Sequence, residues 1–184
     1  MLSLIFGYAG TLTSIVSMQL KRKQHILLSQ AFANGFGALS YLFLGGDSMM
    51  AGTGMILGAI QCLLNYIYTK KEKLLPKLTP CFFLLMSVLN SAVHISASGI
   101  FHFPVDLIPV SCALLFVIGV NVKNAGATRL FFLANSSLWV AYDLMVRPIA
   151  QANLMTHLVV VLSVVVGIVR YDILKGSPVE RMQN

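Results

Sequence analysis

Apolar runs of roughly 20 residues follow one another along almost the whole chain, and short polar segments separate them. A run of this length is enough for an α-helix to cross a hydrocarbon layer about 30 Å thick. In lipid, a helix also satisfies every backbone hydrogen bond within a single segment. The pattern predicts seven spanning helices, at about 3–20, 25–44, 48–68, 79–98, 104–121, 127–146 and 149–170.

The composition agrees with a membrane protein. Hydrophobic residues make up 57% of the 184 residues and charged residues only 10%, whereas a soluble domain carries about 25% charged residues. The alternative, a soluble helical protein with an unusually apolar core, would have too little polar surface. The segment 1–10 has no basic residue before its apolar run, so we interpret it as the first helix and not as a cleaved signal peptide.

The basic residues indicate how the chain is oriented. If the N-terminus lies outside, the regions around the inner ends of the helices hold twelve of the thirteen Lys and Arg residues, namely Lys21, Arg22, Lys23, Lys70, Lys71, Lys73, Lys77, Lys123, Arg129, Arg170, Lys175 and Arg181. Cytoplasmic loops carry such an excess of positive charge. The sequence therefore predicts an external N-terminus and a cytoplasmic C-terminus. The basic residues at the predicted cytoplasmic ends of the helices account for the net charge of +7. This charge therefore does not indicate nucleic-acid binding.

Two segments of the chain repeat one another. Residues 33–41 read ANGFGALSY and residues 134–142 read ANSSLWVAY, so Ala, Asn and Tyr recur at an offset of 101 residues. Two triplets of helices with the same direction through a membrane need one linker helix between them. The sequence predicts an all-α membrane protein with a 3+1+3 parallel pseudo-repeat; chance similarity between apolar segments is the alternative. The predicted units are a first bundle (1–69), a loop and linker helix (70–99), a second bundle (100–173) and a cytoplasmic tail (174–184).

The stretch FHFPVDLIPV at 101–110 resembles the YgjV-type bacterial inner-membrane proteins, which carry a similar His-x-Pro-Val-acid-Leu-x-Pro-Val segment. The matching residues are His102, Pro104, Val105, Asp106, Leu107, Pro109 and Val110. More distantly, the 3+1+3 layout is similar to the SWEET and PQ-loop proteins, which move sugars or amino acids by alternating access. The resemblance implies a bacterial inner-membrane location, a transport function and a hinge at Pro109, for which a static kink is the alternative. Because the helix at 3–20 has no matching proline, and the paired asparagines of the SWEET pattern do not recur in place, sugar specificity is not implied.

Polar residues inside the predicted spans are few, and one set of them follows a single helix face. Asn135, Trp139 and Asp143 are spaced four residues apart in the helix predicted at 127–146. An amide can both donate to and accept from solute hydroxyls, and a Trp ring can cover a small solute. These residues are candidates for solute binding. The alternative for Trp139 and Asp143 is anchoring at the membrane interface, where Trp is common.

Asn34, Gln61 and His157 complete the predicted solute site. Asn34 is the repeat partner of Asn135 and would approach the centre of the bundle from the other side. The alternative for these residues is hydrogen bonding between helices, typically worth ~0.6–2 kcal/mol each. Gly54 and Gly58 form a GxxxG pattern, which predicts close packing within the bundle or between subunits of a homo-oligomer.

Motifs for other functions are missing from the sequence. The chain has no HExxH, no GxSxG and no P-loop, and its three cysteines have no zinc-type spacing. We therefore expect neither an enzyme nor a bound metal or cofactor, and the expected partners are membrane lipids and a small polar solute. The predicted function is solute transport by alternating access between two bundles. The alternative is a non-transporting accessory membrane protein whose polar residues only pack helices.

Overall fold

The computed structural model describes residues 1–44, 48–73, 75–76, 78–98, 103, 107–145 and 150–174, except for the side chains of 44, 48–51, 94–95, 97–98, 143 and 150–153. Within these residues the structure is helical and contains no strand, which confirms the predicted all-α fold. The helices are α1 (Leu2–Met18), α2 (Lys23–Leu44), α3 (Ser48–Lys70), α4 (Leu78–Ser98), α5 (Leu107–Asn121), α6 (Ala125–Met145) and α7 (Ala150–Ile168), and α7 continues into a π-helical turn, η1 (Val169–Ile173). Most predicted boundaries are met within three residues, whereas residues 104–106, predicted to open the fifth helix, lie outside the described residues.

Two helical segments, Lys23–Phe43 and Leu154–Ile173, have the length and hydropathy needed to cross a membrane. Three shorter apolar segments, Leu2–Met18, Leu78–Val93 and Leu107–Asn121, add to them. Large apolar side chains on several helices point outward, as Leu4, Leu85, Leu130 and Leu162 do. A surface of this kind suits contact with lipid, and the predicted number of seven spans stays a prediction.

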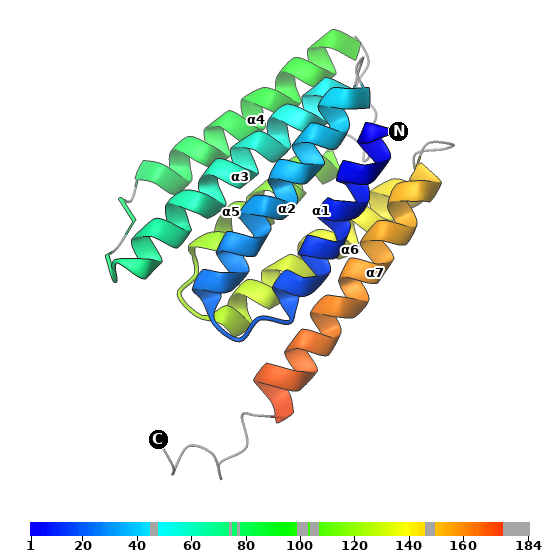
Figure 1. Ribbon diagram of the computed structural model, residues 1–184. Helices are drawn as coiled ribbons and strands as arrows, with labels where there is room; N and C mark the ends of the chain where they lie inside the picture. Colours follow the sequence, from blue (N-terminus) through cyan, green and yellow to red (C-terminus); the bar gives the residue numbers. More distant parts are fainter. Residues whose placement is uncertain are drawn as a thin grey trace, which may run out of the picture.

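The helices form two triplets (Figure 1). In the first, α2 lies between α1 and α3; in the second, α6 lies between α5 and α7. The triplets meet where α1 packs against α7 and where α3 packs against α5, and we call these contacts the α1/α7 seam and the α3/α5 seam. The central helices α2 and α6 approach each other between the two seams, and α4 packs against both α3 and α5.

Small residues let neighbouring helices approach closely. A Cβ added at Gly10 of α1 would lie 3.1 Å from the carbonyl oxygen of Ala33 in α2. Gly54 faces the side chain of Asn90 in α4, and Gly58 faces Asn34 in α2 and Phe116 in α5. The predicted GxxxG pair therefore packs within the bundle, where the missing side chains make room for other helices.

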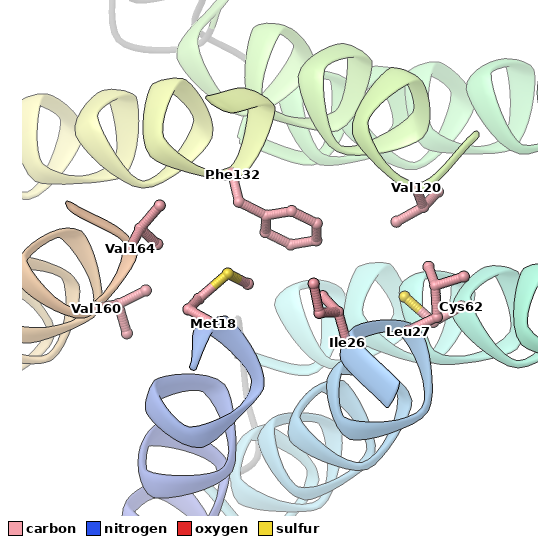
Figure 2. Close-up of a cluster of buried hydrophobic side chains, with 8 residues drawn as sticks. All are labelled: Met18, Ile26, Leu27, Cys62, Val120, Phe132, Val160 and Val164. Carbon is pink, nitrogen blue, oxygen red and sulfur yellow. The ribbon is translucent and has the colours of Figure 1, made fainter. Parts of the chain in front are cut away.

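The apolar core lies toward one end of the bundle, where α1, α5 and α7 end and α2 and α6 begin; we call it the basic end. Figure 2 shows the cluster, to which six helices contribute: Met18, Ile26, Leu27, Cys62, Val120, Phe132, Val160 and Val164. The ring of Phe132 points from α6 into the space between the two triplets. Because each triplet supplies part of this cluster, burial of its apolar surface holds the two triplets together.

The α1/α7 seam predicts a contrast between two glycines. A Cβ at Gly167 would collide with the backbone carbonyl oxygen of Met18, whereas a Cβ at Gly35 would meet nothing within 4 Å. We expect Gly167→Ala to destabilise the protein by about 1–3 kcal/mol, because backbone must shift to relieve overpacking. Gly35→Ala should be neutral or stabilise by up to about 1 kcal/mol through helix propensity. Thermal unfolding of the purified variants in detergent measures both changes, and a loss in Gly35→Ala as large as in Gly167→Ala would contradict the packing.

Candidate functional site

The residues predicted to bind solute lie in different parts of the interior. Asn135 and Trp139 share a face of α6 by spacing, yet Asn135 contacts α5 and Trp139 contacts α7. The side chain of Asp143 lies outside the described residues. Asn34 and Gln61 lie in the first triplet, on α2 and α3. The structure therefore describes three local arrangements, one at Asn135, one at Trp139 and one at Asn34 and Gln61.

Asn135 links two helices of the second triplet. Its amide Nδ2 donates to the carbonyl oxygen of Cys112 in α5 at 2.6 Å, and the Cys112 thiol lies 3.7 Å from the carbonyl oxygen of Asn135. Both residues are buried. Because this amide N–H is already used, Asn135 acts as a packing residue in this conformation.

Aromatic rings join α6 to α7 farther from the basic end. The Trp139 and His157 rings stack with centroids 5.8 Å apart and planes 17° apart, and Tyr142 meets Trp139 edge-on at 5.4 Å. Stacked and edge-on pairs of this kind contribute about 0.5–1.5 kcal/mol each beyond area burial. Trp139 and His157 are thus neighbours, as a shared site requires, but each ring face is turned toward the other.

Asn34 and Gln61 are the amides that lack partners. In the described part of the structure, Asn34 Nδ2 and Gln61 Nε2 are shielded from solvent and make no hydrogen bond. Gln61 is only 2% exposed. A buried donor left unpaired costs about 1–3 kcal/mol, so these two groups are unfavourable unless something else supplies an acceptor.

The α3/α5 seam surrounds these amides. Gly58, Gln61, Cys62 and Asn65 recur at i, i+3, i+4 and i+7, so they share one face of α3. A Cβ at Gly58 would lie 3.3 Å from Asn34 Nδ2 and 3.5 Å from the Phe116 ring of α5. Cys62 of α3 and Val120 of α5 belong to the same buried apolar cluster (Figure 2). Two hollows formed by described residues lie elsewhere, on the surface of α4 and beside the start of α1.

Pro109 is the third residue of α5 as described. The first turn of a helix has N–H groups without intrahelical partners, so a proline there removes no hydrogen bond from the helix. The described helix therefore gives no reason for a bend at this residue, and the hinge at Pro109 stays a prediction. Among the residues that the structure describes, no three His, Cys, Asp or Glu side chains gather closely enough to hold a metal ion.

The sequence interpretation overlooked a buried ion pair at the basic end. Arg129 of α6 is 1% exposed, and its Nη1 donates to both carboxylate oxygens of Asp172 in η1 at 2.9 and 3.1 Å. Its Nε donates to the carbonyl oxygen of Met18 at 3.2 Å, and its Nη2 donates to that of Leu20. These carbonyls belong to the end of α1, where backbone oxygens lack helical partners. One guanidinium thus joins α1, α6 and η1.

Comparison with known proteins identifies the family. A family model of bacterial inner membrane proteins, Imp-YgjV, matches residues 1–175. The chain belongs to this family. No curated protein and no solved structure matches the YgjV-family chain. The family match confirms the resemblance at 101–110 and gives the protein a bacterial inner-membrane location.

Membership of the YgjV family changes how Arg129 is understood. Arg129 had counted only as one of the cytoplasmic charges, yet it lies inside a predicted span, and a charge within an inner-membrane protein needs a partner. Asp172 is the acidic residue at the end of the adjacent helix. One basic and one acidic residue at the ends of neighbouring helices were the sequence signal that could have predicted this ion pair.

The ion pair predicts a specific loss of stability in this YgjV-family protein. Arg129→Met would leave the Asp172 carboxylate and two carbonyls without their donor, and we expect a loss of about 3 kcal/mol, at the low end for buried pairs because Asp172 is partly exposed. Arg170→Met is the control, because Arg129 and Arg170 both lie over the Tyr171 ring but Arg170 is exposed. We expect Arg170→Met to lower the free energy of unfolding by less than about 1 kcal/mol. Thermal unfolding of the two variants in detergent measures both losses of stability. Similar losses would contradict a stabilising role of the buried Arg129 ion pair.

The two kinds of buried amide predict opposite effects on stability. Gln61→Leu replaces an unpaired buried amide with an apolar group of similar size, so we expect the free energy of unfolding to stay equal or rise by about 1 kcal/mol. Asn135→Leu breaks the bond to Cys112 and leaves that helix contact weaker, so we expect a loss of about 1–2 kcal/mol. The same unfolding assay measures both variants. A clear loss in Gln61→Leu would mean that Gln61 has a structural partner.

Proposed function

We propose that this inner-membrane protein carries a small polar solute across the membrane by alternating exposure of a site between its two triplets. The observation that carries the proposal is the unpaired amide of Gln61, together with that of Asn34. In a protein with an apolar exterior, two unpaired donors in the interior lower the stability of this conformation. Their presence is understandable if a solute or water accepts from them in another conformation.

The packing of the helices supports the proposed repeat. Exchanging α1 with α5, α2 with α6 and α3 with α7 turns the α1/α7 seam into the α5/α3 seam, and it leaves the α2–α6 contact in place. This is the contact pattern that two like-oriented triplets related by a two-fold axis along the membrane normal would have. In this proposal α4 is the linker helix, and seven helices cross the membrane.

The proposed orientation places the basic end at the cytoplasm. The start of α1 and the end of η1 lie at opposite ends of the bundle, as an odd number of crossings requires (Figure 1). An excess of Lys and Arg near the helix ends favours the cytoplasmic side for the basic end. Arg129 and the apolar core of Figure 2 would then close the cytoplasmic side of the interior.

In the proposed mechanism, Asn34 and Gln61 bind the solute. Asn135 and Trp139 hold the facing helices in place, and movement of one triplet against the other changes which side of the membrane reaches the site. The sequence contains no P-loop, so the proposal is facilitated or ion-coupled movement and not ATP-driven pumping. The second candidate is an accessory membrane protein. The bonds of Asn135 and Arg129 favour it, since both side chains serve packing.

Flux through liposomes tests the proposal. The purified protein is reconstituted, and the entry of small polar solutes is followed by light scattering during osmotic swelling. We expect protein-dependent entry of at least one solute class, and Gln61→Leu should slow it by about tenfold, which corresponds to losing one hydrogen bond of about 1.4 kcal/mol. Ile60→Leu is the matched control because Ile60 is the adjacent residue and is 47% exposed. Absence of any protein-dependent flux, or equal flux in Gln61→Leu, favours the accessory role.

A further inference from the structure

The two seams between the triplets differ in the hydrogen bonds that cross them. In the α1/α7 seam, Gln19 Nε2 donates to the carbonyl and hydroxyl oxygens of Ser163 at 2.7 and 3.0 Å, and Ser163 Oγ donates to the carbonyl oxygen of Ile15 at 2.9 Å. Gly167 brings α7 against the backbone of α1, and Arg129 binds the end of α1. Separating α1 from α7 would break several hydrogen bonds at once.

The α3/α5 seam has no comparable hydrogen bonds between its described residues. Among the described residues, no hydrogen bond joins α3 to α5. Gly58 lies against Phe116, and Cys62 and Val120 belong to one apolar cluster. The hydrogen-bonding groups of α5 are used within α5 or toward α6. The unpaired amides of Asn34 and Gln61 lie on this seam. Opening it would break none of the hydrogen bonds between described residues and would make two unpaired donors accessible.

Charge is missing from the middle of the helices around the α3/α5 seam, and a cation near it, Lys23 at the start of α2, interacts with Cys62 at the basic end. Residues 26–44, 48–69 and 107–121 contain no Asp, Glu, Lys, Arg or His. A charged solute between these segments, beside Asn34 and Gln61 and away from Lys23, would lose its hydration without gaining an opposite charge from them, which is strongly unfavourable. An uncharged solute with hydroxyl or carbonyl oxygens would instead satisfy the two free amide N–H groups, while the Phe116 ring contacts its apolar part.

We infer that the α3/α5 seam is the side that opens, that the α1/α7 seam stays closed, and that the opened seam binds an uncharged oxygen-bearing solute through Asn34 and Gln61. The solute assignment rests on the proposed function, whereas the opening of the seam is independent of any flux. Of the residues predicted to bind solute, this inference assigns solute contact to Asn34 and Gln61. Asn135 donates to the carbonyl oxygen of Cys112 in α5 and is a packing residue.

The three native cysteines provide a direct measurement of opening. Cys62 is fully buried on the α3/α5 seam, next to Gln61. Cys112 is equally buried but faces Asn135 within the second triplet, and Cys81 is exposed on α4. N-ethylmaleimide is added to the full chain in liposomes, and modification of each cysteine is followed by mass spectrometry of its peptide. Cys81 then reports complete access and Cys112 reports access to an interior that stays closed.

We expect Cys81 to react fastest, Cys112 to stay unmodified and Cys62 to react at an intermediate rate. Glycerol or xylitol at high concentration should slow modification of Cys62 at least about threefold, because bound solute occupies the space beside it. Glycerate and xylonate, which differ from them by a carboxylate, should not protect Cys62. Gln61→Leu and Asn34→Leu should each abolish the protection while leaving Cys62 reactive.

Each other outcome overturns a defined part of the inference. If Cys62 is as inert as Cys112, the α3/α5 seam does not open, and solute flux measured in the same liposomes would then require another route. If Cys62 reacts but neither polyol protects it, the seam opens without binding such a solute. If the acids protect as well as the polyols, the assignment to uncharged solutes is wrong. Reaction of Cys112 as fast as Cys62 would mean general unfolding and not opening of one seam.

Discussion

A polar group inside this protein depends on other protein groups for its hydrogen bonds, because large apolar side chains cover much of the described surface around it. Arg129 is 1% exposed, and its guanidinium donates to the Asp172 carboxylate and to two backbone carbonyls at the end of α1. Its buried charge is therefore satisfied by protein groups. Asn135 and Ser163 donate to backbone carbonyls of adjacent helices. These bonds determine which helices stay together, since apolar packing alone discriminates weakly between helix neighbours that are surrounded by lipid.

Gln61 is the exception, and this makes it informative. Evolution tolerates a buried unsatisfied group where function uses it or where water enters in another state. The same helix face carries Gly58 and Cys62, and among the described residues it meets α5 without a hydrogen bond. A seam without hydrogen bonds between described residues thus coincides with the unpaired amide N–H groups of Asn34 and Gln61. The bundle is thus strong along one edge and weak along the other, which is the mechanical requirement for one triplet to rock against its partner.

The sequence predicted the helices well because run length and charged breaks are local signals. All seven described α-helices begin and end within three residues of their predicted bounds, as α2 and α3 do at Lys23–Leu44 and Ser48–Lys70. The site was predicted less well. Spacing correctly puts Asn135 and Trp139 on one face of α6, but only the tertiary packing decides that the first meets α5 and the second α7. Arg129 was assigned to topology because a count of charges ignores burial.

The place of α4 decides how the weak seam can widen. Thr53 Oγ1 of α3 donates to Asn90 Oδ1 of α4 at 2.8 Å, whereas within the described residues no hydrogen bond ties α4 to α5, although the two helices pack together. Since a hydrogen bond in an apolar setting resists separation more than sliding apolar surfaces do, α4 should travel with α3. The separation then occurs along α5, and Phe116 moves away from Gly58 and Asn34 as it does so. A linker helix that moved with α5 instead would have to break the hydrogen bond between Thr53 and Asn90.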